Sequence, residues 1–131
     1  MDNVIINWEK ILLCEMAEKE RLLVYIERLI ELKLESESNG IESFRHFSNE
    51  NSNRFEKVVL GIISQGCMPE VATTIFNNLL SSTKSSNEEY LKKVILVKFA
   101  LLSQKGNITA QNMKPILQSY LGVELMEYYE I

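Results

Sequence analysis

The sequence predicts an all-α fold in which a long N-terminal helix precedes a compact four-helix bundle. The chain has 131 residues, of which 46% are hydrophobic, and this suits one globular domain over residues 1–131. Only two prolines and five glycines interrupt it, so the frequent turns of a sandwich or a barrel have little room. Apolar residues also recur at helical spacing along most of the chain. These three observations favour helices over strands.

The first expected element is a helix over residues 4–37, long enough at about 1.5 Å per residue to reach about 50 Å. Its apolar residues recur near helical spacing with Glu and Lys between them: Trp8, Leu12, Met16, Leu23, Ile26 and Ile30. The wholly polar centre at residues 18–21 predicts a bend or a solvated middle. Residues 36–40 (SESNG) end the helix, because their side chains compete for backbone hydrogen bonds and the glycine can form a C-terminal cap.

A polar loop, SNENSN at residues 48–53, is expected to be the main internal boundary, and residues 41–47 before it suit one short helical turn. The loop would separate an N-terminal arm from a helical bundle over residues 54–121. Within that bundle, helical periodicity resumes after the loop, ends at Gly66 and begins again at Pro69, a residue that suits the first turn of a helix.

The next helix, over residues 90–104, is expected to lie at the centre of the bundle. Ser86 and Glu89 form a capping-box pattern ahead of it. Its segment VILVKFALL is apolar on nearly every side, which predicts burial all round. Lys98 interrupts this segment, and we assign it no catalytic role because such a lysine usually extends its ammonium to the surface.

Two segments, IISQGCMPEVATTIFNNLL and LLSQKGNITAQNMKPILQSYL, align as a weak internal repeat of a helix-turn-helix corner. Two such corners side by side would make a four-helix unit. In the second corner, Gly106 can end one helix in the left-handed conformation and Thr109 can cap the next. Pro115, six residues beyond that cap, either kinks the last helix or begins it.

The second corner resembles the loop of an EF-hand, because Gly106 followed by Ile108 matches its turn glycine and its core-facing aliphatic residue. The ligand positions would then fall on Leu101, Ser103, Lys105 and Asn112, which supply no acid for calcium. The segments GNITAQNMKPIL and LGVEL are also similar to a helical stretch of the archaeal and eukaryotic acidic ribosomal stalk proteins. That similarity covers the last quarter of the chain, and we interpret it as the same joint reached independently.

The residue types that common catalytic and metal sites need are scarce. His46 is the one histidine of the sequence and has no cysteine near it, which disfavours zinc. Ser43 and Ser48 lie close to His46 in sequence, but no local motif predicts an oxyanion hole beside them. Cys14 and Cys67 are expected to be buried free thiols rather than a bridge or a redox pair. With no phosphate-binding glycine motif either, we expect no enzyme, no cofactor and no metal, and an enzyme of unrecognised type is the third and least favoured hypothesis.

The formal net charge of -4 is unevenly distributed. Residues 90–123 contain lysines but no acid, and four of these lysines could form a basic stripe: Lys92, Lys93, Lys105 and Lys114. This stripe supports an alternative hypothesis, a nucleic-acid-associated regulator. Nucleic acid is nevertheless the less favoured partner, because the last helix offers only Lys114 and an acidic segment follows it. The sequence shows neither a leader nor an apolar run that could span a membrane, so we expect a cytoplasmic protein.

The favoured hypothesis is a small helical protein-binding module of the adaptor, chaperone, antidote or inhibitor type. The apolar stripe of the first helix is too long for one small core, so part of it could pair with a second copy or with a target helix. Trp8, Leu12 and Met16 are the expected anchors, because aromatic and Met side chains are enriched at such contacts. Packing of these residues on their own bundle is the alternative. The acidic aromatic tail at residues 123–131 is interpreted as a docking peptide or as a strap over the basic stripe.

Overall fold

The computed structural model describes residues 3–40, 42–49 and 52–126. Within these ranges the chain is all-α, as predicted, and contains no strand. Its helices are α1 (Trp8–Leu12), α2 (Met16–Asn39), α3 (Glu42–Asn49), α4 (Arg54–Ser64), α5 (Pro69–Ser82), α6 (Asn87–Lys105) and α7 (Ala110–Gln118). Two short 3-10 helices follow α7, namely η1 (Ser119–Leu121) and η2 (Val123–Leu125).

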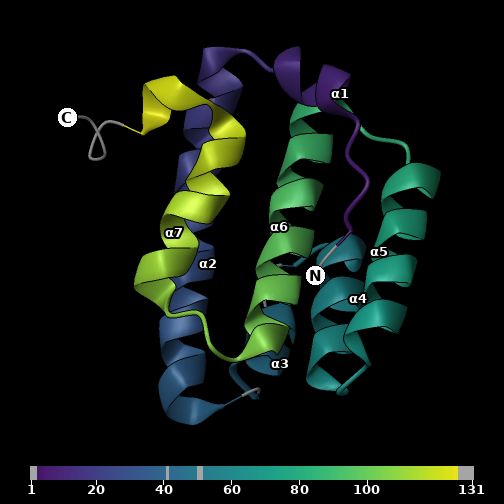
Figure 1. The fold of residues 1–131 in the computed structure, drawn as a ribbon, viewed down its shortest axis with the longest axis vertical. Helices are drawn as coiled ribbons and strands as arrows, with labels where there is room; N and C mark the ends of the chain where they lie inside the picture. The colour runs from purple at the N-terminus through teal and green to yellow at the C-terminus, as the bar shows by residue number, and fades with distance from the viewer. Residues whose placement is uncertain (1–2, 41, 50–51, 127–131) are drawn as a thin grey trace.

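Helix α6 occupies the centre of the molecule and contacts α1, α2, α4, α5 and α7 (Figure 1). Ten of its residues are buried: Tyr90, Leu91, Val94, Ile95, Leu96, Val97, Phe99, Ala100, Leu101 and Leu102. The expectation of a central helix is therefore confirmed, because a helix that is apolar nearly all round is stable in water only where other helices cover it. Lys98, in the middle of the apolar run, is half-buried.

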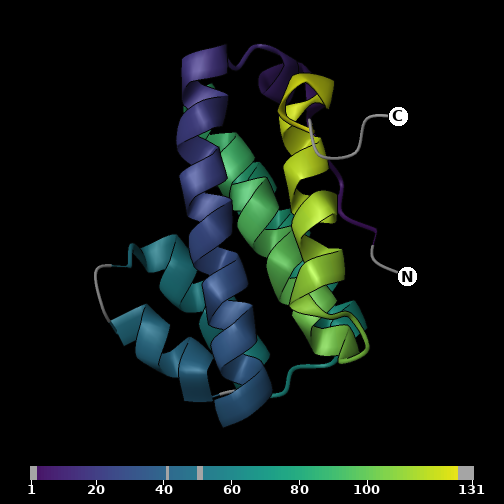
Figure 2. The same ribbon diagram turned by 90° about the vertical axis from the view of Figure 1, so that its left-hand side faces the viewer.

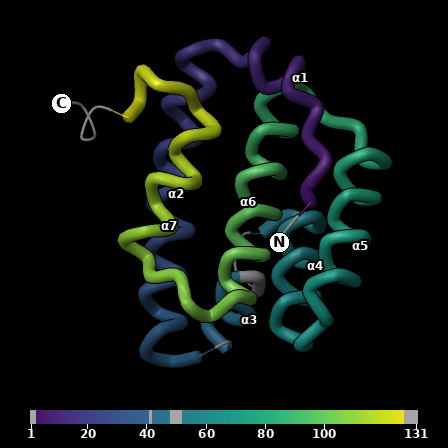
Figure 3. Tube along the Cα trace, in the orientation of Figure 1, coloured from purple at the N-terminus to yellow at the C-terminus, as the bar shows by residue number. Residues whose placement is uncertain are grey.

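Helices α2 and α7 pack together on one flank of α6, and α4 and α5 lie on the other (Figures 1 and 2). Helix α1 crosses the end at which α6 begins, while α3 contacts α2 and α4 at the opposite end (Figure 3). Helix α2 buries a full face against these neighbours, including Leu22, Ile26 and Leu29. The main part of the predicted N-terminal arm therefore packs on its own chain.

The prediction of one continuous helix over residues 4–37 is wrong. Residues 3–7 are not helical, α1 is only five residues long, and the chain breaks between Leu12 and Met16 before α2 begins. The cause of the break is local capping, because the Glu15 amide donates to Glu18 Oε1 at 2.7 Å and so starts a new helix. The polar run at 18–21 that suggested a bend lies instead within the first turns of α2.

Both predicted glycine corners are present. Gly66, between α4 and α5, has a φ of +74°, and Gly106, between α6 and α7, has a φ of +73°. Thr109 caps α7 as expected, because its Oγ1 accepts the amide hydrogen of Asn112 at 3.3 Å. Pro115 lies inside α7, so the alternative in which it begins the last helix is not observed. The segment is a corner that turns the chain back along α2.

The predicted capping box at the start of α6 is also confirmed. The Glu89 amide donates to Ser86 Oγ, and the Ser86 amide donates to Glu89 Oε1, both at 3.2 Å. A second box, which was not predicted, starts α4, where Asn53 and Glu56 exchange the same two bonds at 2.9 and 3.0 Å. These caps fix where each helix begins and therefore how the corners are set.

Candidate functional site

Four large apolar side chains are exposed where α1 passes into α2, and we call them the apolar elbow: Trp8, Leu12, Leu13 and Met16. Their exposed fractions are 52%, 77%, 60% and 40%, respectively. The three anchors predicted from the sequence thus lie together on the surface. Leu13 could not be predicted as part of this surface from an unbroken helix, in which Leu13 falls outside the apolar stripe.

Local structure explains why the elbow faces outward. Ile11 and Cys14 are only 3% and 6% exposed, so this part of the chain directs them into the core. Trp8 also packs on its own chain, since its ring stacks on Tyr120 of η1 with the centroids 5.9 Å apart. The alternative of intramolecular packing therefore holds for one face of Trp8, while about half of its surface stays in water. Figure 2 shows α1, in purple, beside the yellow segment that follows α7 and contains η1.

Acidic residues lie close to the elbow along the chain. The segments at 8–20 and 119–126 contain two lysines and five glutamates. We call the five glutamates the acidic rim: Glu9, Glu15, Glu18, Glu20 and Glu124. Of these, only Glu18 is half-buried and the others are exposed. The stacking of the Trp8 ring on the Tyr120 ring places residues 119–126 beside residues 8–20. The elbow is therefore an apolar surface with exposed acidic residues in the segments that form it and adjoin it.

Two nearby cations are already engaged by other groups of the chain. Lys10 Nζ donates to the Ser85 carbonyl oxygen at 2.9 Å. The Arg21 guanidinium donates to both oxygens of Glu88, at 2.7 and 2.9 Å, and this bond lowers the pKa of the Glu88 carboxyl. A hydrogen bond to a carbonyl leaves the charge of Lys10 in place, and Lys19 lies in the same segment. The five glutamates and two lysines of residues 8–20 and 119–126 therefore give a formal net charge of -3.

A free thiol lies beneath the elbow. Cys14 Sγ donates to the Lys10 carbonyl oxygen at 3.6 Å, and burial followed by the Glu18 carboxylate raises the pKa of this thiol. Cys67 is also free but only half-buried, so the expectation of two buried thiols is correct for Cys14 alone. Burial and the Glu18 carboxylate both keep the Cys14 thiol in its protonated form, which is unreactive.

We expect iodoacetamide to modify Cys14 at least about tenfold more slowly than Cys67 in the folded chain at about pH 8, because alkylation requires an exposed thiolate. Peptide mass spectrometry after timed quenching measures both rates in one sample. In denaturant the two rates should become similar. Equal rates in the folded chain would show that α1 opens readily and would contradict the packing described for Ile11 and Cys14.

The four lysines of the expected basic stripe lie on two helices, α6 and α7, and have different neighbours. Lys92 and Lys93 lie in the first half of α6, where both engage groups of their own chain. Lys105 lies at the other end of α6, about 20 Å along the helix axis. Lys114 is on α7 and forms an ion pair with Glu27 of α2 at 2.7 Å. The spacing of these lysines in the sequence did not predict that they would have different neighbours in the fold.

A buried polar cluster between α2 and α4 is the arrangement that most resembles a catalytic site. Tyr25 Oη donates to Glu56 Oε2 at 2.7 Å, and the Asn53 amide donates to Glu56 Oε1 at 3.0 Å. Lys92 Nζ lies 4.6 Å from the centroid of the Tyr25 ring, beside a hollow of about 170 Å³. Burial, followed by the Glu56 carboxylate, raises the pKa of Tyr25 well above its ordinary range. Both oxygens of the Glu56 carboxylate accept hydrogen bonds from the chain itself. The cluster therefore links α2 to α4, and we do not interpret it as a base that faces a substrate.

His46 is exposed on α3, beside a hollow of about 230 Å³ that Glu31 and Glu35 also line. Among the described residues, no three His, Cys, Asp or Glu side chains are grouped so that they could hold a metal ion. None of the described helices is both long enough and apolar enough to cross a membrane. Of the predicted acidic tail, residues 127–131 lie outside the described part of the chain.

Comparisons with known proteins add no candidate function. The chain matches no family model, no curated protein and no solved structure. The apolar elbow and its acidic rim are therefore the candidate site on the strength of their geometry and charge.

Proposed function

We propose that this protein is a helical protein-binding module whose docking surface is the apolar elbow. The exposure of Leu12 and Leu13, at 77% and 60%, supports the proposal most directly. Burying such a side chain contributes roughly 1.5–3 kcal/mol, so the two leucines together offer a large part of the free energy of a moderate complex. Adjoining exposed apolar side chains with a polar border are typical of interaction sites.

The partner that fits this surface is an amphipathic helix with an apolar face flanked by Lys or Arg. A helix laid on the elbow would bury Trp8 and the leucines, as helix-in-groove complexes do with their anchors. Its basic flanks would meet the acidic rim, and such complementarity raises the association rate and sets the preferred partner. Because the rim is exposed to water, its charges should contribute less free energy than the apolar contact.

A second copy and a nucleic acid both suit the elbow less well. Two copies that met through their elbows would bring two acidic rims together, and like charges oppose that contact. Nucleic-acid phosphates would be repelled by the same rim, and the lysines of the alternative hypothesis lie in separate neighbourhoods. We therefore propose a different protein as the partner.

A synthetic helical peptide with a Leu face and Lys flanks tests the proposal. Labelled with fluorescein and titrated with the full chain, it should bind in fluorescence anisotropy, and Leu12→Ser with Leu13→Ser should weaken this binding at least about tenfold. The affinity should also fall as salt is added, because the rim charges are screened. A peptide with the same Leu face and Glu flanks should bind several-fold more weakly.

Leu34→Ser provides the matched control, because Leu34 is also exposed, at 52%, but lies near the opposite end of α2. It should leave the affinity unchanged. Binding that is lost equally in the Leu34 variant, or that favours the Glu-flanked peptide, would count against the elbow and its rim. Far-UV circular dichroism of each variant checks that the helices remain intact.

A further inference from the structure

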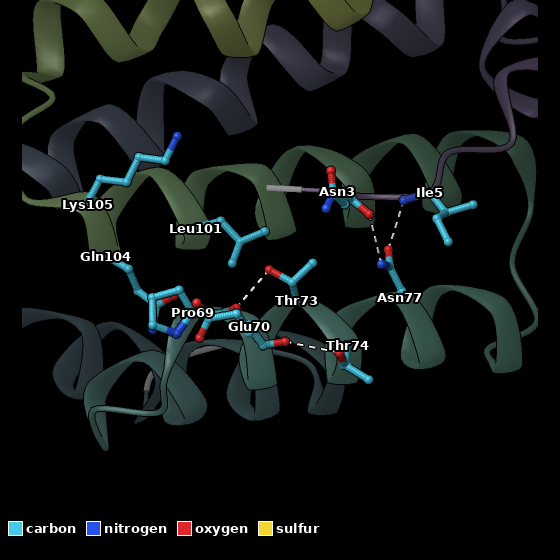
Figure 4. A pocket seen from close by; sticks show the side chains of 10 residues that line it. All are labelled: Asn3, Ile5, Pro69, Glu70, Thr73, Thr74, Asn77, Leu101, Gln104 and Lys105. Carbon is cyan, nitrogen blue, oxygen red and sulfur yellow. Dashed lines mark hydrogen bonds between the residues drawn. The ribbon is translucent and has the colours of Figure 1, made fainter. Parts of the chain in front are cut away.

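The chain before α1 is extended and lies in a groove between α5 and α6. We call residues 3–7 the N-terminal segment, and Figure 4 shows it crossing this groove at Asn77 of α5. The segment is not paired with any strand, since the described residues contain none. Its backbone hydrogen bonds must therefore be met by side chains or by water.

One side chain binds the segment as a neighbouring strand would. Asn77 Oδ1 accepts the Ile5 amide hydrogen at 2.9 Å, and Asn77 Nδ2 donates to the Asn3 carbonyl oxygen at 3.0 Å (Figure 4). Further along, the Asn7 amide donates to Tyr90 Oη at 2.8 Å. All three bonds reach main-chain groups, so they would hold any extended peptide regardless of its sequence.

The side chains of the segment alternate between the groove and the solvent. Val4 and Ile6 pack against the core, whereas Ile5 between them is 72% exposed. This is the period of two that an extended chain has when one face is buried. The groove thus accepts apolar side chains at two alternate positions of an extended peptide.

The segment does not fill the groove. A hollow of about 370 Å³ lies at its beginning, lined by Pro69, Thr73 and Leu101 among others, and a second hollow of about 580 Å³ adjoins Ile6 and Tyr90. Both volumes fall within the range of roughly 300–1,000 Å³ that is usual for ligand sites. A longer peptide on the same path could therefore make contacts that residues 3–7 do not make.

We propose that the groove between α5 and α6 is a binding site for an extended peptide of another protein, and that the chain's own residues 3–7 occupy it in the free state. The incoming peptide would take over the main-chain bonds of Asn77 and Tyr90 and place apolar side chains where Val4 and Ile6 lie. The tethered segment competes at an effective concentration in the millimolar range. The partner displaces it by also filling the hollow beside Leu101.

This site is distinct from the apolar elbow in position and in ligand chemistry. It binds an extended main chain through an amide side chain, whereas the elbow is proposed to bind a helix through leucines. Asn77→Ala should therefore leave the affinity for the Lys-flanked helical peptide unchanged. The two proposals can fail separately.

The test uses the full chain with Val4→Asp and Ile6→Asp, which remove the apolar contacts of the segment. The probe is a labelled peptide with the sequence of residues 3–7 preceded by Val-Thr-Val-Thr, so that it reaches the hollow beside Leu101. It should bind this variant at least about tenfold more tightly than it binds the unsubstituted chain. A probe with the sequence of residues 3–7 alone should bind several-fold more weakly than the longer one.

In the same variant, Asn77→Ala should reduce the affinity at least about tenfold, because both main-chain bonds are lost. Asn78→Ala is the matched control, since Asn78 is the exposed neighbour on α5. No binding to the Asp variant, or an equal loss with Asn77→Ala and Asn78→Ala, would overturn the proposal.

Hydrogen exchange of the unsubstituted chain keeps the proposal testable if the Asp variant fails to fold. The amides of Ile5 and Asn7 should exchange at least about 100-fold faster than those of Val94 and Ile95 in α6, because the segment opens without global unfolding. Excess long probe should shift the side-chain amide resonances of Asn77. Equal protection of the segment and of α6, or unmoved Asn77 resonances, would show that the segment is not displaced.

Discussion

Phe99→Ala is expected to lower the free energy of unfolding by about 3–5 kcal/mol. Phe99 is fully buried in α6, the helix that all the larger helices contact, and its ring meets Phe44 of α3 edge to face at a centroid distance of 5.9 Å. Truncating the side chain removes buried apolar surface and leaves a cavity, because the surrounding helices can relax only partly to fill it. Urea denaturation followed by circular dichroism measures the change.

Phe55→Ala is the control for this prediction. Phe55 is only half-buried on α4, with Lys93 Nζ 5.4 Å from its ring centroid, so its loss should cost about 1–2 kcal/mol. Because a domain of this size is stable by roughly 5–15 kcal/mol, the Phe99 variant should lose a large part of its stability. Similar losses for the two variants would contradict the central position of α6.

Glu56→Ala is expected to lower the free energy of unfolding by about 3 kcal/mol, the second largest effect. The Glu56 carboxylate accepts hydrogen bonds from the Tyr25 hydroxyl and from the Asn53 amide, and it is only 6% exposed. Its removal leaves a buried hydroxyl without an acceptor and also breaks the capping box of α4. Thermal and urea unfolding should both report the loss.

Glu89→Ala separates the two contributions, because Glu89 has the same place in the capping box of α6 but is exposed. It should cost about 1 kcal/mol, which is the effect of the cap alone. Tyr25→Phe should account for most of the remainder, since it leaves Glu56 Oε2 without its donor. If Glu56→Ala cost no more than Glu89→Ala, the link between α2 and α4 would not be a stabilising one.

Most of the helical core could be predicted from the sequence because its signals are local. The apolar run VILVKFALL, the capping pair Ser86 and Glu89, and the glycine corner at Gly106 each depend on residues within a few positions of one another. A helix whose pattern, start and end all agree leaves few alternatives. These elements were therefore correct in type and close in their boundaries.

The break before α2 could not be predicted from periodicity, because the apolar spacing continues across it. Trp8, Leu12 and Met16 follow helical spacing as closely in the sequence as the residues of α2 do. The decisive signal is Glu15 followed by Glu18, and glutamate is an uncommon residue at the N-cap position, which Glu15 occupies. The same break produces the elbow, so the error in the fold and the omission of Leu13 have one cause.

The groove between α5 and α6 gave no signal in the sequence. Asn77 and Ile5, whose amide it binds, are 72 positions apart in the sequence. Neither residue belongs to a motif, and an asparagine in a helix has no preferred distant partner. Only the packing of α1 against α6 brings the N-terminal segment to α5.

Intrinsic fluorescence tests the central claim most directly, because the chain's one tryptophan, Trp8, belongs to the apolar elbow. Titration with a Lys-flanked helical peptide that lacks tryptophan should move the emission of Trp8 to shorter wavelength and reduce its quenching by iodide, since the indole becomes buried. The Glu-flanked peptide should cause neither change. Emission that stays constant while anisotropy reports that the Lys-flanked peptide binds would show that binding occurs elsewhere, and it would contradict the elbow as the docking surface.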